Sequence, residues 1–298
     1  MALYAFDGTW NKDKPGTERD TNVLWFCSAY TEDTFYQKGV GTRVGKLGKI
    51  IGGISGAGGR SRVRKARKKL VANFNRGDTT IDIVGFSRGA ALALHLANKI
   101  DAKGVETKAG RVFPKVRFLG LWDTVAAFLL PDVPANIGWD LDLPDCVEHC
   151  FHALALDEMR HAFKPERLEE RLADTSDEGV LHECWFRGVH SDIGGGNKNS
   201  GLSSITLDWM FGNARRCGLK LDQAVIKKNR ARIKPKAPIS KHKESVGREK
   251  LRVVRATDPV HESVRFRPDT RARRHNNPPV GAAVVSNTGR RVRSFRRA

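Results

Sequence analysis

One stretch constrains the fold more than any other: residues 81–97, which read IDIVGFSRGAALALHLA. A short apolar run rich in β-branched residues is typical of a buried strand, and the alanines and leucines after it are typical of a helix. Ser87 stands between them, at a sharp corner. Similar segments alternate along the chain, so the sequence predicts an α/β fold with a mainly parallel sheet and helices on both faces.

The same patterns place the other elements. Short apolar runs bounded by turn residues predict further strands at 3–6, 34–41, 79–86, 115–123 and 183–190. Longer segments predict helices at 22–30, 60–78, 88–100, 145–162 and 201–219.

Ser87 lies in a Gly-x-Ser-x-Gly pattern. In a nucleophile elbow the serine occupies a strained turn, and the flanking glycines let the strand and the helix approach closely. The start of the helix directs its N–H groups at the corner, which suits a developing oxyanion. We therefore predict that Ser87 is a nucleophile; the alternative is an ordinary serine in a turn.

A serine nucleophile needs a base, and the chain has nine histidines. His190 ends a strand-like run and enters the loop HSDIGGGN. Open α/β sheets place reactive groups where strands end. His95 instead lies about two turns along the helix that follows Ser87 and should point elsewhere. We predict His190 as the base; the alternative is a loop histidine that caps a turn.

The acid should also follow a strand. Asp123 in FLGLWDTV fits, and it gives the chain order Ser, Asp, His that is typical of α/β-hydrolases. Asp192, two residues after His190, and Asp7, after the first strand, are the alternatives.

The loop after the first strand reads FDGT. A phosphatase of the Asp-x-Asp-Gly-Thr type would need an aspartate where Ala5 stands, which excludes that reading. We expect one oxyanion N–H from Gly8 or Thr9 and the second from Arg88. Asp7 and Asp192 are then expected to support the loops of the site.

The sequence predicts no cofactor and no metal. Cys146 and Cys150 lie near His149 and His152, but their spacing is not that of a usual zinc site and no second pair follows. The five cysteines are scattered and odd in number, which favours a reducing compartment.

A glycine-rich segment spans residues 39–59. It lacks the Gly-Lys-Ser/Thr of a nucleotide-binding loop, because Leu47 follows the Gly-Lys pair. A mobile loop near the active site and simple flexibility remain as alternatives.

The net charge of +20 is concentrated late in the chain: residues 221–298 hold 22 Lys and Arg against 6 Asp and Glu. We predict a catalytic domain at 1–220, a basic extension at 221–270 partly packed on it, and a disordered tail at 271–298. The basic segment suits a polyanion; its few aromatic residues favour an anionic membrane surface over nucleic acid, and the alternative is a solvated tail.

The N-terminus has no basic start followed by an apolar core, and no apolar run reaches membrane-spanning length. These observations predict synthesis as a cytoplasmic chain without a signal peptide.

Seven motifs occur in order: YAFDGTWN, GVGT, GDTTIDIVGFSRGAA, FLGLWDTV, HALALDEMRHAF, CWFRGVHSDIGGGN and GLSSITLDWM. Together, from about Leu3 to Leu219, they resemble the uncharacterised α/β-hydrolase domain family that includes the class-one type VI secretion phospholipase effectors. The resemblance implies a triad of Ser87, Asp123 and His190, ester hydrolysis on glycerophospholipids, and export by a contact-dependent secretion system. The effectors carry a further large module for membrane anchoring, where this chain has its basic segment.

The sequence thus predicts a serine esterase of the phospholipase or lipase type, acting on a lipid or another acyl ester. A catalytically silent module that binds polyanions through the basic segment is the alternative from another class. A peptidase is also compatible with the three residues.

Overall fold

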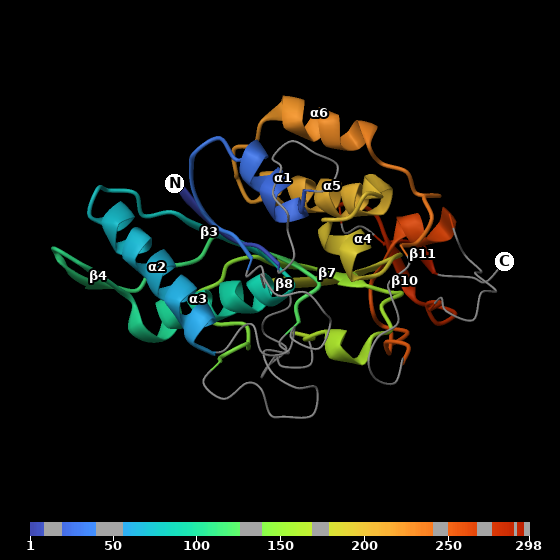
Figure 1. The fold of residues 1–298 in the computed structure, drawn as a ribbon, viewed down its shortest axis with the longest axis horizontal. Coiled ribbons are helices and arrows are strands. Elements are labelled where there is room, and N and C mark those ends of the chain that lie inside the picture. Colours follow the sequence, from blue (N-terminus) through green and yellow to red (C-terminus); the bar gives the residue numbers. More distant parts are fainter. Residues whose placement is uncertain are drawn as a thin grey trace.

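The computed structural model describes residues 1–8, 20–39, 56–125, 139–168, 179–240, 250–266, 276–288 and 291–294. In this part of the chain, nine strands form one sheet in the order β11-β10-β9-β8-β7-β6-β3-β1-β2 (Figure 1). All neighbouring pairs are parallel except β10 and β11. The predicted α/β class with a mainly parallel sheet is confirmed.

The strands of the sheet are β1 (Ala2–Phe6), β2 (Asp33–Gln37), β3 (Ile81–Phe86), β6 (Phe118–Trp122), β7 (Cys150–Ala155), β8 (Leu181–Phe186), β9 (Val260–His261), β10 (Ala283–Val285) and β11 (Arg291–Ser294). A separate hairpin joins β4 (Val105–Thr107) and β5 (Gly110–Val112). The helices are α1 (Asn22–Ala29), α2 (Gly56–Phe74), α3 (Arg88–Lys103), α4 (His190–Gly194), α5 (Ser200–Arg216) and α6 (Gln223–Ala231), with 3₁₀ turns at His161–Phe163 and Glu262–Phe266.

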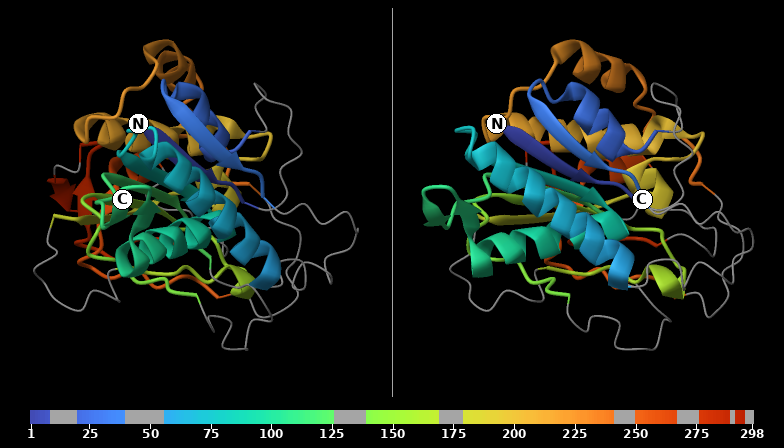
Figure 2. Two further views of the ribbon diagram at one scale, coloured as in Figure 1. Left: turned by 90° about the vertical axis from the view of Figure 1, so that its left-hand side faces the viewer. Right: turned by 60° about the vertical axis from the view of Figure 1, so that its left-hand side comes forward.

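Helices cover both faces of the sheet (Figure 2). Alternate residues of β1 explain how: Tyr4 buries in the core beneath α2 and α3, whereas Leu3 buries in the core beneath α1 and α5. Strands β3 and β6 divide their apolar side chains in the same way. Among the helices of the described residues, none has the length and apolar composition to cross a bilayer.

The helix predicted at 145–162 is wrong. Residues 150–155 form β7, which pairs in parallel with β6 on one side and β8 on the other. The run CFHALA is buried throughout, because a central strand is covered on both faces, and a mainly apolar run of this kind cannot be told from a buried helix by periodicity. His152 consequently lies in the middle of the sheet, fully buried.

Helix α6 was not expected from sequence. Asp222 caps its start by accepting a hydrogen bond from the N–H of Ala224. It buries only Ile226 and Asn229, so it carries too short an apolar face for a clear helical period.

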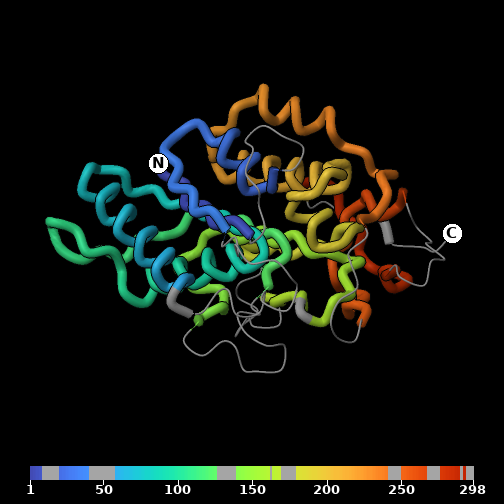
Figure 3. Tube along the Cα trace, in the orientation of Figure 1, coloured from blue at the N-terminus to red at the C-terminus, as the bar shows by residue number. Residues whose placement is uncertain are grey.

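Strands β9, β10 and β11, which follow α6 in the chain, extend the sheet outward from β8 (Figure 3). Val260, Ala282 and Val284 pack with Trp185 in a third apolar cluster. Sequence assigned 271–298 to a disordered tail; its described pieces, 276–288 and 291–294, contain β10 and β11. The domain boundaries at 220 and 270 remain predictions.

Candidate active site

Ser87 lies at the junction of β3 and α3. Its φ of 59° is positive, a conformation that costs a residue with a Cβ about 1–3 kcal/mol and that persists only where the surroundings impose it. They do so here: the N–H of Ser87 donates to the carbonyl of Trp122 at 2.9 Å, and the N–H of Ala90 donates to the carbonyl of Ser87 at 3.0 Å. The serine is thereby fixed at the strained turn expected of a nucleophile elbow.

The two glycines of the motif are required by close packing. A Cβ on Gly85 would lie 2.6 Å from Cα of Ala90, and a Cβ on Gly89 would lie 2.2 Å from the carbonyl oxygen of Phe6. Both contacts are with backbone, which cannot move aside. The close approach of strand and helix at this corner therefore depends on glycine at both positions.

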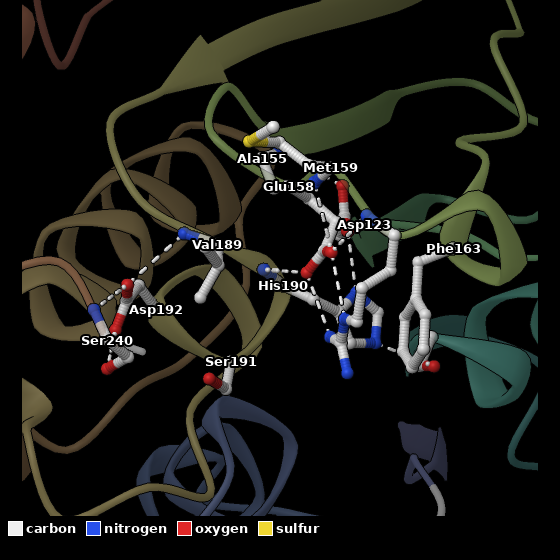
Figure 4. A network of polar contacts seen from close by, with 12 residues as sticks. Asp123, Ala155, Glu158, Met159, Phe163, Val189, His190, Ser191, Asp192 and Ser240 are labelled. Carbon is white, nitrogen blue, oxygen red and sulfur yellow. Dashed lines mark hydrogen bonds and ion pairs between the residues drawn. The ribbon is translucent and has the colours of Figure 1, made fainter. Parts of the chain in front are cut away.

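The structure brings Ser87, His190 and Asp123 together. Nε2 of His190 lies 2.8 Å from Oγ of Ser87. Its Nδ1 lies 2.6 Å from Oδ2 of Asp123 (Figure 4). The carboxylate can only accept, so Nδ1 carries the proton and Nε2 is the acceptor for the serine hydroxyl. His190 is the first residue of the short helix α4, where sequence had placed a loop.

These side chains are almost closed off from solvent: Ser87 and His190 are each 6% exposed, and Asp123 is 0% exposed. Burial lowers the pKa of His190, although the hydrogen bond and charge of Asp123 oppose it. An imidazole with a lowered pKa is uncharged at neutral pH. It can therefore accept a proton from Ser87.

Asp123 is fixed more firmly than either partner. Its Oδ1 accepts from the N–H of Ala155 at 2.8 Å. The guanidinium of Arg252 donates to both oxygens, at 2.6 Å to Oδ1 and 3.0 Å to Oδ2. Burial alone would raise the pKa of Asp123, but the charge of Arg252 and the bond to His190 outweigh it and hold this pKa below its ordinary value.

Acidic residues that follow β7 hold the loop of His190. Glu158 accepts from the N–H of His190 at 3.2 Å, and Asp157 accepts from the N–H of Gly188 at 2.7 Å. Burial would raise the pKa of Glu158, but its pair with Arg160 outweighs burial and lowers the value to about 2. The segment after β7 is thus hydrogen-bonded to the loop that carries His190.

Aromatic side chains enclose the imidazole. The ring of Phe86, from β3, lies 4.7 Å from that of His190, and the ring of Phe163 lies 4.9 Å from it. The guanidinium of Arg160 stacks 3.6 Å from the centre of the Phe163 ring. These contacts leave little freedom for the imidazole to rotate away from Ser87.

The two aspartates expected to support loops make contacts of that kind. Oδ2 of Asp192 accepts from the N–H groups of Val189 and Ser240, at 3.1 and 2.9 Å. Asp7 accepts from the hydroxyls of Thr21 and Tyr36, at 2.8 and 2.7 Å. Neither takes the place of Asp123 on His190.

The loop after β1 lies beside the serine. A Cβ added to Gly8 would be 3.4 Å from Cβ of Ser87. The N–H of Gly8 donates to Oδ1 of Asp7 at 2.7 Å, so it would have to leave this carboxylate to meet an oxyanion. Arg88 is the first residue of α3, where N–H groups have no partner within the helix. Thr9 lies outside the described residues, as does most of the glycine-rich segment 39–59.

Sequence reasoning missed Arg252, Asp157 and Glu158. The two acids sit in the motif HALALDEMRHAF, directly after a strand end, and would have been candidates had the segment not been assigned to a helix. Arg252 gave no signal, because it is one of many cations in a basic segment.

Within the described residues, no group of three or more His, Cys, Asp and Glu side chains is arranged to hold a metal ion. Of the residues considered for zinc, His152 is bonded to Thr124 and Glu183, and Sγ of Cys146 lies 3.6 Å from the carbonyl of Ala97.

The sheet, its helical layers and the serine at the strand–helix turn define an α/β-hydrolase-like fold. The chain belongs to the family described as the catalytic domain of type VI secretion phospholipase effectors like Tle1, whose model matches residues 3–115 and 105–213. The resemblance seen in the sequence motifs is thus confirmed.

Solved structures that are similar to this chain include the following two. One is described as the crystal structure of an uncharacterized protein from Pseudomonas aeruginosa. It is 21% identical in sequence, and the match has a TM-score of 0.52 and covers 78% of this chain and 48% of the other protein's chain. The other is the Tle1 effector bound to the VgrG spike of the type VI secretion system, at 23% identity, 65% and 50% coverage and a TM-score of 0.46. This chain spans about half the length of each. Among curated proteins there is no match.

Proposed function

We propose that this chain is a serine hydrolase that cleaves acyl esters, with phospholipids as the substrate class. The observation that carries the proposal is the hydrogen-bonded series from Ser87 through His190 to Asp123 at a strained strand–helix turn. Membership of the phospholipase effector family supports the choice of lipid esters over peptides.

In the proposed reaction, Oγ of Ser87 attacks the ester carbonyl while Nε2 of His190 takes its proton. The same proton then passes to the leaving alcohol, and the acyl group stays on Ser87. Water, deprotonated by His190, hydrolyses this acyl-enzyme. Asp123 keeps the imidazole in the required tautomer and stabilises the imidazolium that forms in each step.

The negative charge on the carbonyl oxygen needs donors. We assign the N–H of Arg88, at the start of α3, as one, because the helix dipole favours an anion there. Gly8 is the candidate for the second and Thr9 its alternative. Loss of one such donor is expected to slow turnover by about 10²–10³-fold.

The proposed reaction does not require the basic segment to bind a polyanion. Contact with an anionic membrane, or less favourably with nucleic acid, stays a prediction for it. One of its cations, Arg252, is buried against Asp123 and is therefore not available to a polyanion.

The test compares the purified chain with Ser87→Ala and with Ser203→Ala, a matched control at a buried serine of α5. Each protein is incubated with a fluorophosphonate probe, with nitrophenyl butyrate and with vesicles of phosphatidylglycerol or phosphatidylcholine. We expect labelling and ester cleavage in the wild type and the control, and neither in Ser87→Ala.

Cleavage that persists in Ser87→Ala would contradict the proposal. A folded wild type that neither reacts with the probe nor cleaves any ester would favour the silent binding module. Release of peptide products without ester cleavage would favour a peptidase.

A further inference from the structure

Arg252 is a cation in a place where cations are rarely tolerated. Its side chain is 4% exposed. Besides the two bonds to Asp123, it donates to the carbonyl of Ala155 at 2.8 Å and to that of Phe163 at 2.6 Å. A buried arginine with four acceptors around it has a single orientation, and the carboxylate that it holds is fixed with it.

The backbone of Arg252 is anchored by the cluster that holds the loop of the base. The side-chain amide of Asn276 donates to the carbonyl of Arg252 at 2.7 Å. The N–H of Asn276 donates to Asp157 at 2.9 Å, and Arg187 pairs with the same carboxylate at 2.8 Å. Asp157 also accepts a hydrogen bond from the N–H of Gly188, two residues before His190. Asp157 therefore links the backbone of Arg252, through Asn276, to the loop that carries His190.

Charge balance gives Arg252 a second effect. Asp123 is fully buried and ionised, so it needs a cation nearby. Arg252 supplies that cation, and His190 can then remain an uncharged imidazole. Without Arg252, the same need would be met by protonating His190. A resting imidazolium has no lone pair on Nε2 and could not take the proton of the serine.

The other charged groups at His190 do not replace this effect. Among the described residues, Glu158 and Arg160, both after β7, act on the imidazole in opposite directions, and they pair with each other at 2.8 Å. Asp123, after β6, is the remaining charge. Its negative charge is the one that Arg252 offsets.

We propose that Arg252 is a positioning residue of the active site, which fixes the Asp123 carboxylate by two hydrogen bonds and keeps the resting His190 uncharged. The proposal rests on the function proposed above. Arg252 lies outside residues 3–213 that the family model matches, so this contact comes from a part of the chain to which that match assigns nothing. The segment around Arg252 is thereby a component of the catalytic unit.

The test uses Arg252→Gln, with Arg255→Gln as the control, because Arg255 carries the same charge on an exposed position three residues along the chain. Two readouts are measured from pH 4 to 9: kcat/KM on nitrophenyl butyrate, and the pKa of the His190 imidazole by nitrogen NMR. Loss of Arg252 should raise the midpoint of both by about one pH unit, since a nearby cation disfavours the imidazolium. At pH 7 kcat should fall at least tenfold, because the lost geometry adds to the shifted midpoint; the part that recovers as the pH rises should be no more than about threefold.

A loss of kcat without a change in either midpoint would show a merely structural role and overturn the proposal, as would full activity. If Arg252→Gln does not fold, Arg252→Lys takes its place: it keeps the charge but not the two-pronged geometry, so the midpoints should stay and kcat should fall about tenfold. Unchanged kcat in Arg252→Lys would overturn the positioning role.

The NMR midpoint needs no substrate, so the two proposals fail in different ways. An inactive wild type whose His190 still titrates differently in Arg252→Gln would contradict the proposed function and leave the contact of Arg252 established. An active wild type with equal midpoints would contradict the role of Arg252 alone.

Discussion

Two series of hydroxyl, imidazole and carboxylate lie side by side in this protein. One joins Ser87, His190 and Asp123. The other starts at Thr124, the residue after Asp123: its Oγ1 lies 3.0 Å from Nε2 of His152, whose Nδ1 lies 2.9 Å from Oε1 of Glu183.

The resemblance extends to a buried arginine behind each carboxylate. Arg252 donates to Asp123, and Arg167 donates to Glu183 at 3.1 Å. The same residue types at similar distances therefore occur twice, and only one copy stands at a site suited to catalysis.

The difference lies in the setting of the hydroxyl. Ser87 sits at a strained turn against the start of α3, and it is 6% exposed. Thr124 and His152 are both 0% exposed, and the N–H of Thr124 itself donates to Nε2 of His152 at 3.1 Å. The lone pair on Nε2 of His152 is therefore already engaged in a hydrogen bond with the backbone. A hydrogen-bonded series of these groups is therefore not by itself evidence of a nucleophile, and the two hydroxyls differ in exposure and in backbone conformation.

The largest effect is expected when the two hydroxyls are removed in turn. Ser87→Ala should lower kcat by at least about 10³-fold without lowering the free energy of unfolding, because it removes only the attacking atom. Thr124→Val should change kcat by less than about tenfold and cost about 1–2 kcal/mol of stability. Esterase assays and urea unfolding measure the pair. Equal losses of kcat would show that both series take part in the chemistry.

The two imidazoles should separate stability from activity. His152→Gln leaves the buried pair of Glu183 and Arg167 incompletely bonded, so we expect a loss of about 2–4 kcal/mol in the free energy of unfolding. His190→Gln should abolish turnover with a change in stability of about 1 kcal/mol or less. Denaturant unfolding monitored by tryptophan fluorescence gives both values. A His190→Gln protein as unstable as His152→Gln would contradict the distinction.

The pH profile gives the smallest and finest effect. The base must be uncharged, so activity is present above the pKa of His190 and is lost as the pH falls through it. Burial lowers this pKa below its ordinary value of about 6.5, so activity should be half-maximal at a pH below 6.5 and decline about tenfold per unit at pH values below the lowered pKa. The profile of kcat/KM tests this. An acid limb centred above pH 7 would contradict it.

How much the sequence revealed depended on how local each signal was. The corner at Ser87 was predictable, because the strand, the glycines and the helix are adjacent in the chain and each has a recognisable local sequence pattern. His190 and Asp123 followed from the principle that strand ends share one edge of a parallel sheet. The segment 145–162 was misread because a strand buried on both faces has no period to show.

The sequence by itself determined the α/β class and the strained serine, because hydrophobic period and motif spacing act over a few residues. It offered His190 as the base and Asp123 as the acid, with Asp192 and Asp7 as alternatives to Asp123, and the tertiary structure shows which carboxylate bonds to His190. Only the tertiary structure decided that Arg252 reaches Asp123, 129 residues away, and that Thr124 and His152 lie closed in the core. A salt bridge between distant residues leaves no pattern in either segment. Burial, which distinguishes the two series, is a property of the assembled sheet and its helices.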